Sequence, residues 1–155
     1  MIYFAYGSNI DPVQWQTRCP NSATVGVAQL SGHRLVFPRR SPVRGCAVAS
    51  IEADPRETVW GVLYRMTGDD LSALDAREGC FPDRPEACRY RRAAVMVTAL
   101  EGRAVEALTY MAIPSPDPGL PSQAYLRHII YGALHHRFPE AYVTMLNSLR
   151  SGAVA

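Results

Sequence analysis

The sequence predicts an α+β protein in which a mixed β-sheet or barrel has helices packed on its outside. Four short segments rich in β-formers lie between Val25 and Arg65, and two more lie at Tyr90–Leu100 and Ala104–Ala112. Helical patterns fall before, between and after these segments. The resulting order, β, α, several β, α, ββ, αα, lacks the regular alternation of a doubly wound parallel sheet.

Length and composition predict a single domain that spans residues 1–155. A chain of 155 residues fits one hydrophobic core, and 48% hydrophobic with 19% charged residues is typical of a globular protein. The chain has no apolar run long enough to cross a bilayer and no secretory leader, so we expect a cytoplasmic protein with no membrane partner. The net charge of +2 gives no reason to expect nucleic acid as a partner. The oligomeric state is not indicated.

The cationic and sulfur-bearing residues exclude several kinds of chemistry. All sixteen cationic side chains are arginines, which excludes lysine as a general base or Schiff-base nucleophile. Cys19, Cys46, Cys80 and Cys88 show no C-x-x-C spacing, so neither a zinc site nor a dithiol redox motif is predicted. We expect reduced structural thiols, no metal and no cofactor.

The first part of the chain predicts a buried strand followed by a short helix. Ile2–Tyr6 is a continuous apolar and aromatic run, which favours a central strand covered on both faces. Asp11 is a good N-cap with Pro12 at the first helical position, and the helix should end before Pro20. Four separate strands are then predicted at Val25–Leu30, His33–Phe37, Cys46–Ile51 and Val59–Arg65.

Helix signals return in the second half of the chain. Thr67 and Asp70 resemble a capping box and Gly79 is a good C-terminal stop, so a helix is predicted over Asp69–Glu78. Ser122 should cap a long helix that Pro139 ends, before a final helix. The apolar positions expected to face the core are Leu126, Ile129, Ile130, Ala133 and Leu134 on the long helix, and Tyr142, Val143, Leu146 and Leu149 after it.

Three arginines lie in a connection rich in Pro, Ser and Gly between two predicted strands. We favour a solvated loop for Arg39, Arg40 and Arg44, and the alternative is a rim that contacts an anion.

Glu78 is a candidate proton carrier because of its place on the predicted helix. It lies seven residues after Leu71 and four after Leu74, on the stripe that should face the core. A carboxyl group in apolar surroundings has a raised pKa, which suits proton transfer near neutral pH. The alternative is a helix-end glutamate that bends to solvent or pairs with Arg77 or Arg84. For Asp75, one turn earlier, we favour a surface or capping role, and the alternative is a pair with Glu78.

Gly7, Ser8 and Asn9 follow the buried strand directly and precede a helix start. A turn at such a place can point several backbone N–H groups at one spot, where a carboxylate or a developing oxyanion can bind. Gly7 would permit either a backbone conformation closed to other residues or the close approach of a ligand. The alternative is that Ser8 and Asn9 satisfy the turn through their own side chains.

Five stretches, taken in order, resemble the γ-glutamylcyclotransferase family. They are "YFAYGSN", "WGVLYRM", "LDAREG", "LTYMA" and "PSQAYL", and the resemblance extends from Ile2 to about Leu149. It implies a mixed, partly closed β-barrel with flanking helices and a pocket at one end. It also implies an enzyme that releases an amine or amino acid from a small γ-glutamyl substrate and forms 5-oxoproline.

The resemblance also implies roles for particular residues. Glu78 matches the catalytic glutamate, and Gly7, Ser8 and Asn9, preceded by Tyr6, match the loop that holds the substrate. Tyr110 and Tyr125 match tyrosines that line the pocket. Asn9 stands where the glutathione-degrading branch usually has leucine, so the resemblance points away from that branch. The loop Cys80–Cys88 has no clear counterpart and leaves the departing amine open: an amino acid, a polyamine, an ε-linked lysine or part of a secondary metabolite.

The sequence allows two other hypotheses. The first is a non-catalytic binding module that captures a small carboxylate or γ-glutamyl ligand at the Gly7 loop. The second is a thiol enzyme that uses Cys80 with His128 or His135 as its base. These two histidines could in principle share a metal, but we expect both to be solvated on the flank of a helix.

Overall fold

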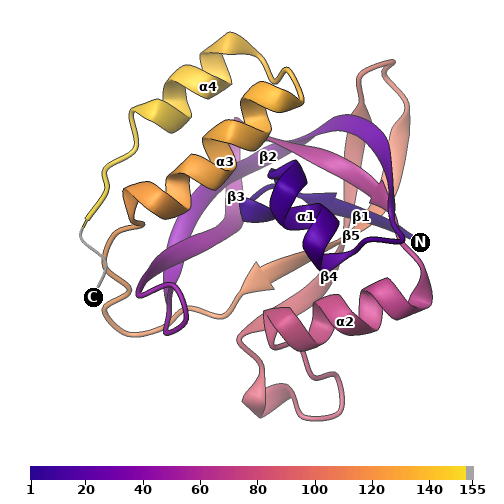
Figure 1. Cartoon of the computed structure of the whole chain (residues 1–155). Coiled ribbons are helices and arrows are strands. Elements are labelled where there is room, and N and C mark those ends of the chain that lie inside the picture. The colour runs from indigo at the N-terminus through magenta and orange to yellow at the C-terminus, as the bar shows by residue number, and fades with distance from the viewer. Residues whose placement is uncertain (153–155) are drawn as a thin grey trace.

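A five-stranded barrel forms the centre of the molecule in the computed structural model, which describes residues 1–152 (Figure 1). The strands are β1 (Ile2–Ala5), β2 (Ala23–Ser41), β3 (Cys46–Arg65), β4 (Tyr90–Ala99) and β5 (Ala104–Ala112). Around the barrel they follow the order β1, β3, β2, β4, β5, and the barrel is closed. The predicted α+β class, with helices outside a barrel, is confirmed.

The first strand is central, as its apolar sequence predicted. β1 pairs antiparallel with β3 and parallel with β5, where Tyr3 lies opposite Leu108. Phe4 and Ala5 are completely buried. Because β1 ends inside the barrel wall, the residues that follow it are held at one end of the barrel.

The prediction of four strands between residues 25 and 65 is wrong, because this region forms two long, bent strands. β2 and β3 pair antiparallel along most of their length, with register shifts at positions 24/26, 31/33 and 36/39. Gly32 has a φ of 73°, which here serves a bulge and not a chain reversal. Of the breaks expected in this region, only the turn between Ser41 and Cys46 separates two strands.

The helices cover the outside of the barrel. They are η1 (Ser8–Ile10), α1 (Pro12–Arg18), α2 (Gly68–Glu78), η2 (Pro85–Ala87), α3 (Gln123–His135) and α4 (Glu140–Asn147). In Figure 1, α3 and α4 lie side by side on one flank, α2 lies at the opposite end, and α1 crosses between them. No described helix has the length and apolar character needed to cross a membrane.

The predicted helix caps are confirmed. The Asp11 side chain accepts the amides of Val13 and Gln14, at 2.9 and 3.4 Å, with Pro12 in the first turn. Thr67 and Asp70 form a reciprocal capping box at the start of α2, and Gly79 ends this helix in the left-handed region with φ 70°. These local contacts fix where α2 ends, and therefore where Glu78 lies.

The described residues share one hydrophobic cluster that joins the barrel to the helices. Most apolar positions predicted for α3 and α4 contribute to it. The prediction is wrong for Leu134, because this residue is 59% exposed. Leu149 packs against the cluster from beyond the end of α4. The last three residues of the predicted single domain, 153–155, lie outside the described residues.

Candidate active site

A pocket of about 300 Å³ lies at the end of the barrel where β1 passes into η1. All seven residues predicted for the site, Glu78 and the six substrate-binding candidates, lie in its wall. Its polar and aromatic lining consists of Tyr3, Tyr6, Ser8, Asn9, Arg18, Arg39, Ser41, Arg44, Arg77, Glu78, Arg89, Tyr90, Tyr110 and Tyr125, with Gly7 among them. The structure therefore brings together residues that are more than a hundred positions apart in the sequence.

The Gly7 loop lines the pocket and has backbone amides without a protein partner in the part of the chain that the structure describes. The hydrogen bonds of the described residues include no protein acceptor for the amides of Gly7, Ser8 and Asn9, whereas the amides of Ile10 and Asp11 close the turn. Such a run of free N–H groups is suited to a carboxylate or an oxyanion.

We predicted two reasons for a glycine at position 7, and the first of them, a backbone conformation closed to other residues, is wrong. Gly7 has φ −99°, outside the left-handed region, so its backbone does not need glycine for that reason. A Cβ at this position would instead come within 3.3 Å of the Ala49 Cβ and 3.6 Å of the Tyr125 hydroxyl. The absence of a side chain keeps the wall of the pocket open beside Tyr125.

Glu78 reaches the pocket from the last turn of α2. Leu74 is fully buried and Leu71 half-buried on the same stripe, so the predicted inward face is confirmed. The Oε1 atom of Glu78 accepts a hydrogen bond from the Asn9 Nδ2 at 3.2 Å, which joins residues 69 positions apart. Burial raises the pKa of the Glu78 carboxyl, while Arg18 and the Asn9 hydrogen bond partly oppose this rise.

The Asn9 side chain is held from both ends. Its Nδ2 also donates to the Tyr3 hydroxyl at 3.1 Å, and its Oδ1 accepts from Arg18 Nη1 at 2.6 Å and Gln14 Nε2 at 3.3 Å. Because the arginine can only donate, it fixes which end of the amide faces Glu78. Sequence reasoning missed Arg18 and Gln14, which belong to the surface of a short helix with no apolar periodicity to orient them.

The three predicted tyrosines differ in what their hydroxyl groups do. Tyr6 donates to the Tyr110 carbonyl, and Tyr110 donates to Asp75 Oδ1 at 2.5 Å. The Tyr125 hydroxyl accepts the Ala49 amide at 2.9 Å, and no described residue accepts its hydrogen. Burial raises the pKa of Tyr125 to about 12, so this group is a neutral donor facing the pocket.

Asp75 corrects another expectation, because it is neither a surface nor a capping residue. Its side chain is 16% exposed, accepts the Tyr110 hydroxyl, and lies 3.4 Å from Arg92 Nε. Asp75 therefore supports the pocket wall from behind Tyr110, and it is not among the residues that line the pocket.

The solvated-loop interpretation of Arg39, Arg40 and Arg44 is wrong in the main. All three are half-buried, and Arg39 and Arg44 line the pocket. Arg44 Nη2 donates to Gln14 Oε1 at 2.7 Å and to Ser8 Oγ at 3.2 Å, and its guanidinium lies 4.9 Å from the centre of the Tyr125 ring. Arg40 instead donates to the Gly45 carbonyl.

The cysteines and histidines considered for a thiol enzyme do not meet at the pocket. Cys80 is a buried free thiol, His128 Nδ1 lies 2.6 Å from Asp11 Oδ2, and His135 lies on the exposed side of α3. None of these three is in the described lining. His128 is half-buried and paired, so our expectation that it is simply solvated is wrong.

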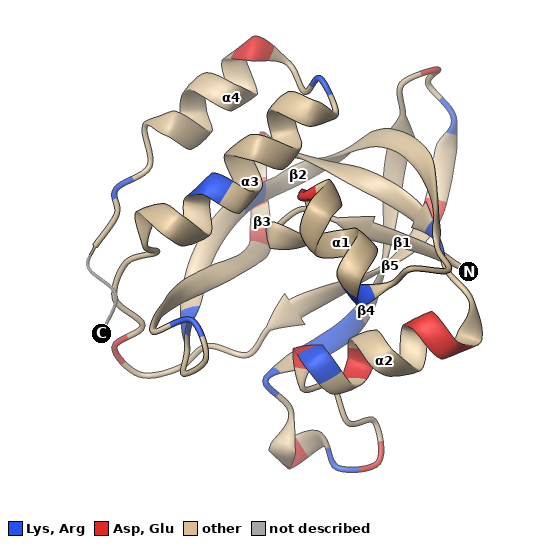
Figure 2. Cartoon of the chain, in the orientation of Figure 1, with Lys and Arg blue, Asp and Glu red and all other residues tan. Residues whose placement is uncertain are grey.

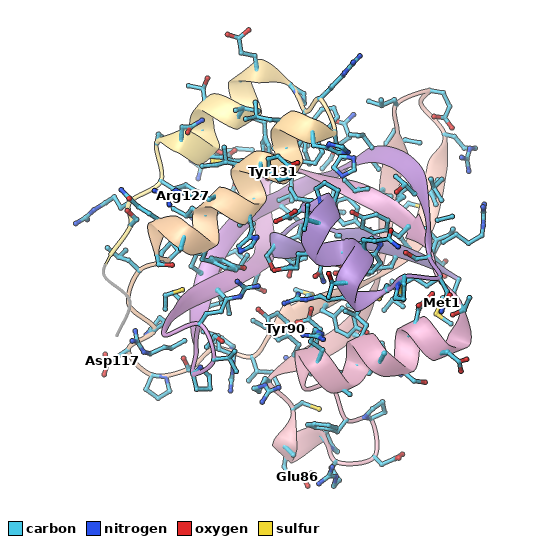
Figure 3. All side chains as sticks on the ribbon, viewed as in Figure 1. Met1, Glu86, Tyr90, Asp117, Arg127 and Tyr131 are labelled. Atoms are coloured by element: carbon cyan, nitrogen blue, oxygen red, sulfur yellow. The ribbon has the colours of Figure 1, made fainter. Side chains whose placement is uncertain are left out.

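Sequence reasoning also missed part of the outer wall. Figure 3 shows Tyr90 in the space between the barrel and α2, whereas Glu86 lies at the outer tip of the loop after α2. Tyr90 donates to the Ala49 carbonyl at 3.0 Å, and Arg77 and Arg89 complete this side of the pocket. The sequence offered one signal for Tyr90, which is that an aromatic residue stands at the start of β4. Its position on a strand does not by itself reveal which cavity the side chain faces.

One end of the closed barrel therefore carries a pocket whose wall includes a half-buried acid and backbone amides without a protein acceptor among the described residues. Comparisons with known proteins show the family to which a chain with this fold and pocket belongs. Residues 58–146 match the AIG2-like family. The chain is 30% identical over 152 residues to the γ-glutamylcyclotransferase of Bos taurus and 29% identical to that of Homo sapiens, and each match covers 96% of this chain and 78% of the relative.

A solved structure agrees with this match. A structure titled "Gamma-glutamyl cyclotransferase" has a TM-score of 0.89 and 28% identity, and the match covers 100% of this chain and 93% of that one. The chain therefore belongs to the γ-glutamylcyclotransferase family and is an enzyme of that type.

Proposed function

We propose that this enzyme cyclises the glutamyl group of a γ-glutamyl amide to 5-oxoproline and releases the amine. The observation that carries the proposal is the position of Glu78. This carboxyl group, with its raised pKa, lies in the wall of the same pocket as the free amides of Gly7, Ser8 and Asn9.

The reaction needs one group that first accepts and then donates a proton. The substrate's α-amine arrives as an ammonium ion, and Glu78 removes one proton so that the nitrogen can attack the γ-carbonyl carbon. The C–N bond of the ring forms, the amide C–N bond breaks, and Glu78 returns the proton to the departing nitrogen. The ring nitrogen loses a second proton after its attack, and the released amine takes up one proton to become an ammonium ion, so the protons balance. Because nucleophile and carbonyl belong to one molecule, proximity can contribute up to about 7–11 kcal/mol, as in ideal intramolecular reactions.

The remaining groups suit the anionic parts of this reaction. We assign the amides of the Gly7 loop and the Tyr125 hydroxyl to the substrate carboxylate or to the oxyanion of the tetrahedral intermediate. One well-placed donor to an oxyanion contributes about 2.7–4 kcal/mol in hydrolases. Tyr6 and Tyr110 already donate to protein atoms, so we assign them to shaping the pocket. No step in this scheme requires a metal or a cofactor.

The substitution Glu78→Gln tests the proposal. Loss of the proton carrier should lower the rate of 5-oxoproline formation by about 10²–10⁴-fold, the usual contribution of general acid–base catalysis. The matched control is Glu86→Gln, which removes the same charge from the exposed loop after α2. Both variants should keep a cooperative thermal transition. Near-normal turnover by a folded Glu78→Gln protein would remove Glu78 from the mechanism.

A further inference from the structure

The pocket carries more positive charge than the reaction itself requires. Five arginines line it, whereas Glu78 is the one carboxylate in its described lining. None of the ion pairs among the described residues involves any of these five arginines. In Figure 2, basic positions gather where the end of α1, the end of α2 and the start of β4 meet.

Three of the five guanidinium groups are already bound to neutral protein atoms. Arg18 donates to Asn9, Arg39 to the Ile113 carbonyl at 2.9 Å, and Arg44 to Gln14 and Ser8. These contacts hold the arginines in the inner wall of the pocket.

Arg77 and Arg89 differ because their guanidinium groups are almost free. Arg77 is exposed and has no side-chain hydrogen bond among the described residues, and Arg89 has a single long one, 3.4 Å from its Nη2 to the Arg77 carbonyl. The position of Arg89 is nevertheless defined. Its backbone amide donates to the Gly79 carbonyl at 2.8 Å, and a Cβ on Gly79 would come within 2.5 Å of the Arg89 Nε. A glycine directly after Glu78 thus lets this guanidinium lie across the end of α2.

The charge of the substrate decides which part of it these two arginines meet. A γ-glutamyl group carries one carboxylate and one ammonium, and the inner amides, Tyr125 and Glu78 suit those charges. The departing amine must lie toward the mouth of the pocket to leave, where Arg77 is exposed. Two neighbouring cations there disfavour a cationic amine and favour an anionic one.

We propose that Arg77 and Arg89 form an anion subsite for the departing amine, and that the preferred substrates are γ-glutamyl amides of acidic amino acids or acidic peptides. This inference rests on the proposed cyclotransferase function. It selects amines with two or more carboxylates over the polyamine and lysine alternatives that the sequence left open.

The test compares γ-glutamyl-glutamate with γ-glutamyl-glutamine, two dipeptides of nearly the same shape that differ by one charge. We expect kcat/KM to favour the glutamate dipeptide by about fivefold, the upper range for partly exposed charge pairs, and to fall further for γ-glutamyl-lysine. Raising the salt concentration should shrink the preference because it screens exposed charges.

Variants assign the preference to these residues. In the double variant Arg77→Gln, Arg89→Gln the ratio of the two kcat/KM values should approach one, whereas the control Arg91→Gln, on the exposed part of β4 and outside the lining, should keep it. The ratio is informative even if the double variant loses activity, since general losses affect both dipeptides equally.

The outcomes separate the two proposals. Turnover of all three dipeptides with no preference for the anionic amine, or a preference that survives in the double variant, would overturn the subsite and leave the proposed function standing. Failure to form 5-oxoproline from any γ-glutamyl amide would overturn the proposed function and the subsite with it.

Discussion

The arginines on the strands far from the pocket differ from those around it in what lies beside them. Arg34 on β2 pairs with Glu52 on β3, Arg56 with Asp54, and Arg103 with Glu101 at the β4–β5 turn. The five arginines of the pocket have no carboxylate partner among the described residues. The same residue type therefore neutralises neighbouring charge in one region and leaves positive charge available in the other.

This difference distinguishes arginines that belong to the scaffold from arginines that belong to the site. A paired surface arginine contributes little to stability or function, because its attraction to the carboxylate is offset by solvation and side-chain entropy. An unpaired charged group held in a pocket wall lowers the stability of the folded state, and a bound ligand can offset this loss. Arg92 lies at the boundary between these two groups of arginines, because it pairs with Asp75 directly behind the pocket wall.

Among the arginines, the largest effect should come from one inside the pocket. Arg18→Gln removes the donor that fixes the Asn9 amide and the strongest of the charges that hold the pKa of Glu78 down. We expect kcat/KM to fall about tenfold or more, the scale of a hydrogen bond from a charged group. The acid limb of the pH–rate profile should move to higher pH, because the pKa of Glu78 rises when Arg18 is removed.

The matched change on the scaffold is Arg34→Gln, which removes the same charge from an exposed pair. Its pH–rate profile should superimpose on that of the unmodified enzyme. An Arg18→Gln enzyme whose acid limb stays in place would show that Arg18 does not act through Glu78.

Local signals explain why the helices and the inward acid were predictable. The Asp11 cap and the Thr67–Asp70 capping box are each complete within a few residues, so the sequence defines where α1 and α2 begin. The spacing from Leu71 and Leu74 then orients Glu78 without any knowledge of the barrel. The resemblance to the family added the partners of Glu78, which lie on β1, β5 and α3 or follow them closely.

Non-local pairing explains what was missed. Gly32 and Pro38 look like chain breaks, but each lies at a register shift inside β2 because β3 pairs on both sides of it. Once β2 is continuous, Arg39 lies on a strand and reaches the pocket, which no loop interpretation could show. Arg89 depends in the same way on a glycine ten residues earlier in the chain.

A second, smaller effect concerns the free energy of unfolding, in which variants of two carboxylates, Glu78 and Glu52, should differ. The folded-state pKa of Glu78 is raised, so its contribution to stability is fully present below its unfolded pKa and is lost as pH rises through its folded pKa. Glu78→Gln should therefore be more stable than the unmodified protein above that pH, by about 1 kcal/mol, the scale for a buried polar group that is incompletely paired. The difference should close as the solution is acidified. Thermal melts across pH measure it.

Glu52→Gln supplies the contrast for this experiment, because Glu52 pairs with Arg34 on the barrel surface. It should give no gain in stability at any pH. Equal behaviour of the two glutamine variants would mean that the pocket does not strain the Glu78 carboxylate, and would weaken its assignment as a proton carrier.

The smallest effect should come from the scaffold pair itself. The side chains of Arg34 and Glu52 are about half exposed, 53% and 48%, so water and salt screen their attraction. A double-mutant cycle with Arg34→Gln and Glu52→Gln should give a coupling free energy of about 0.2–1 kcal/mol, and it should decrease when salt is raised. Chemical denaturation at two salt concentrations measures it. A coupling above about 2 kcal/mol would show that surface pairs support this barrel, and the distinction between paired scaffold arginines and unpaired pocket arginines would then lose its energetic basis.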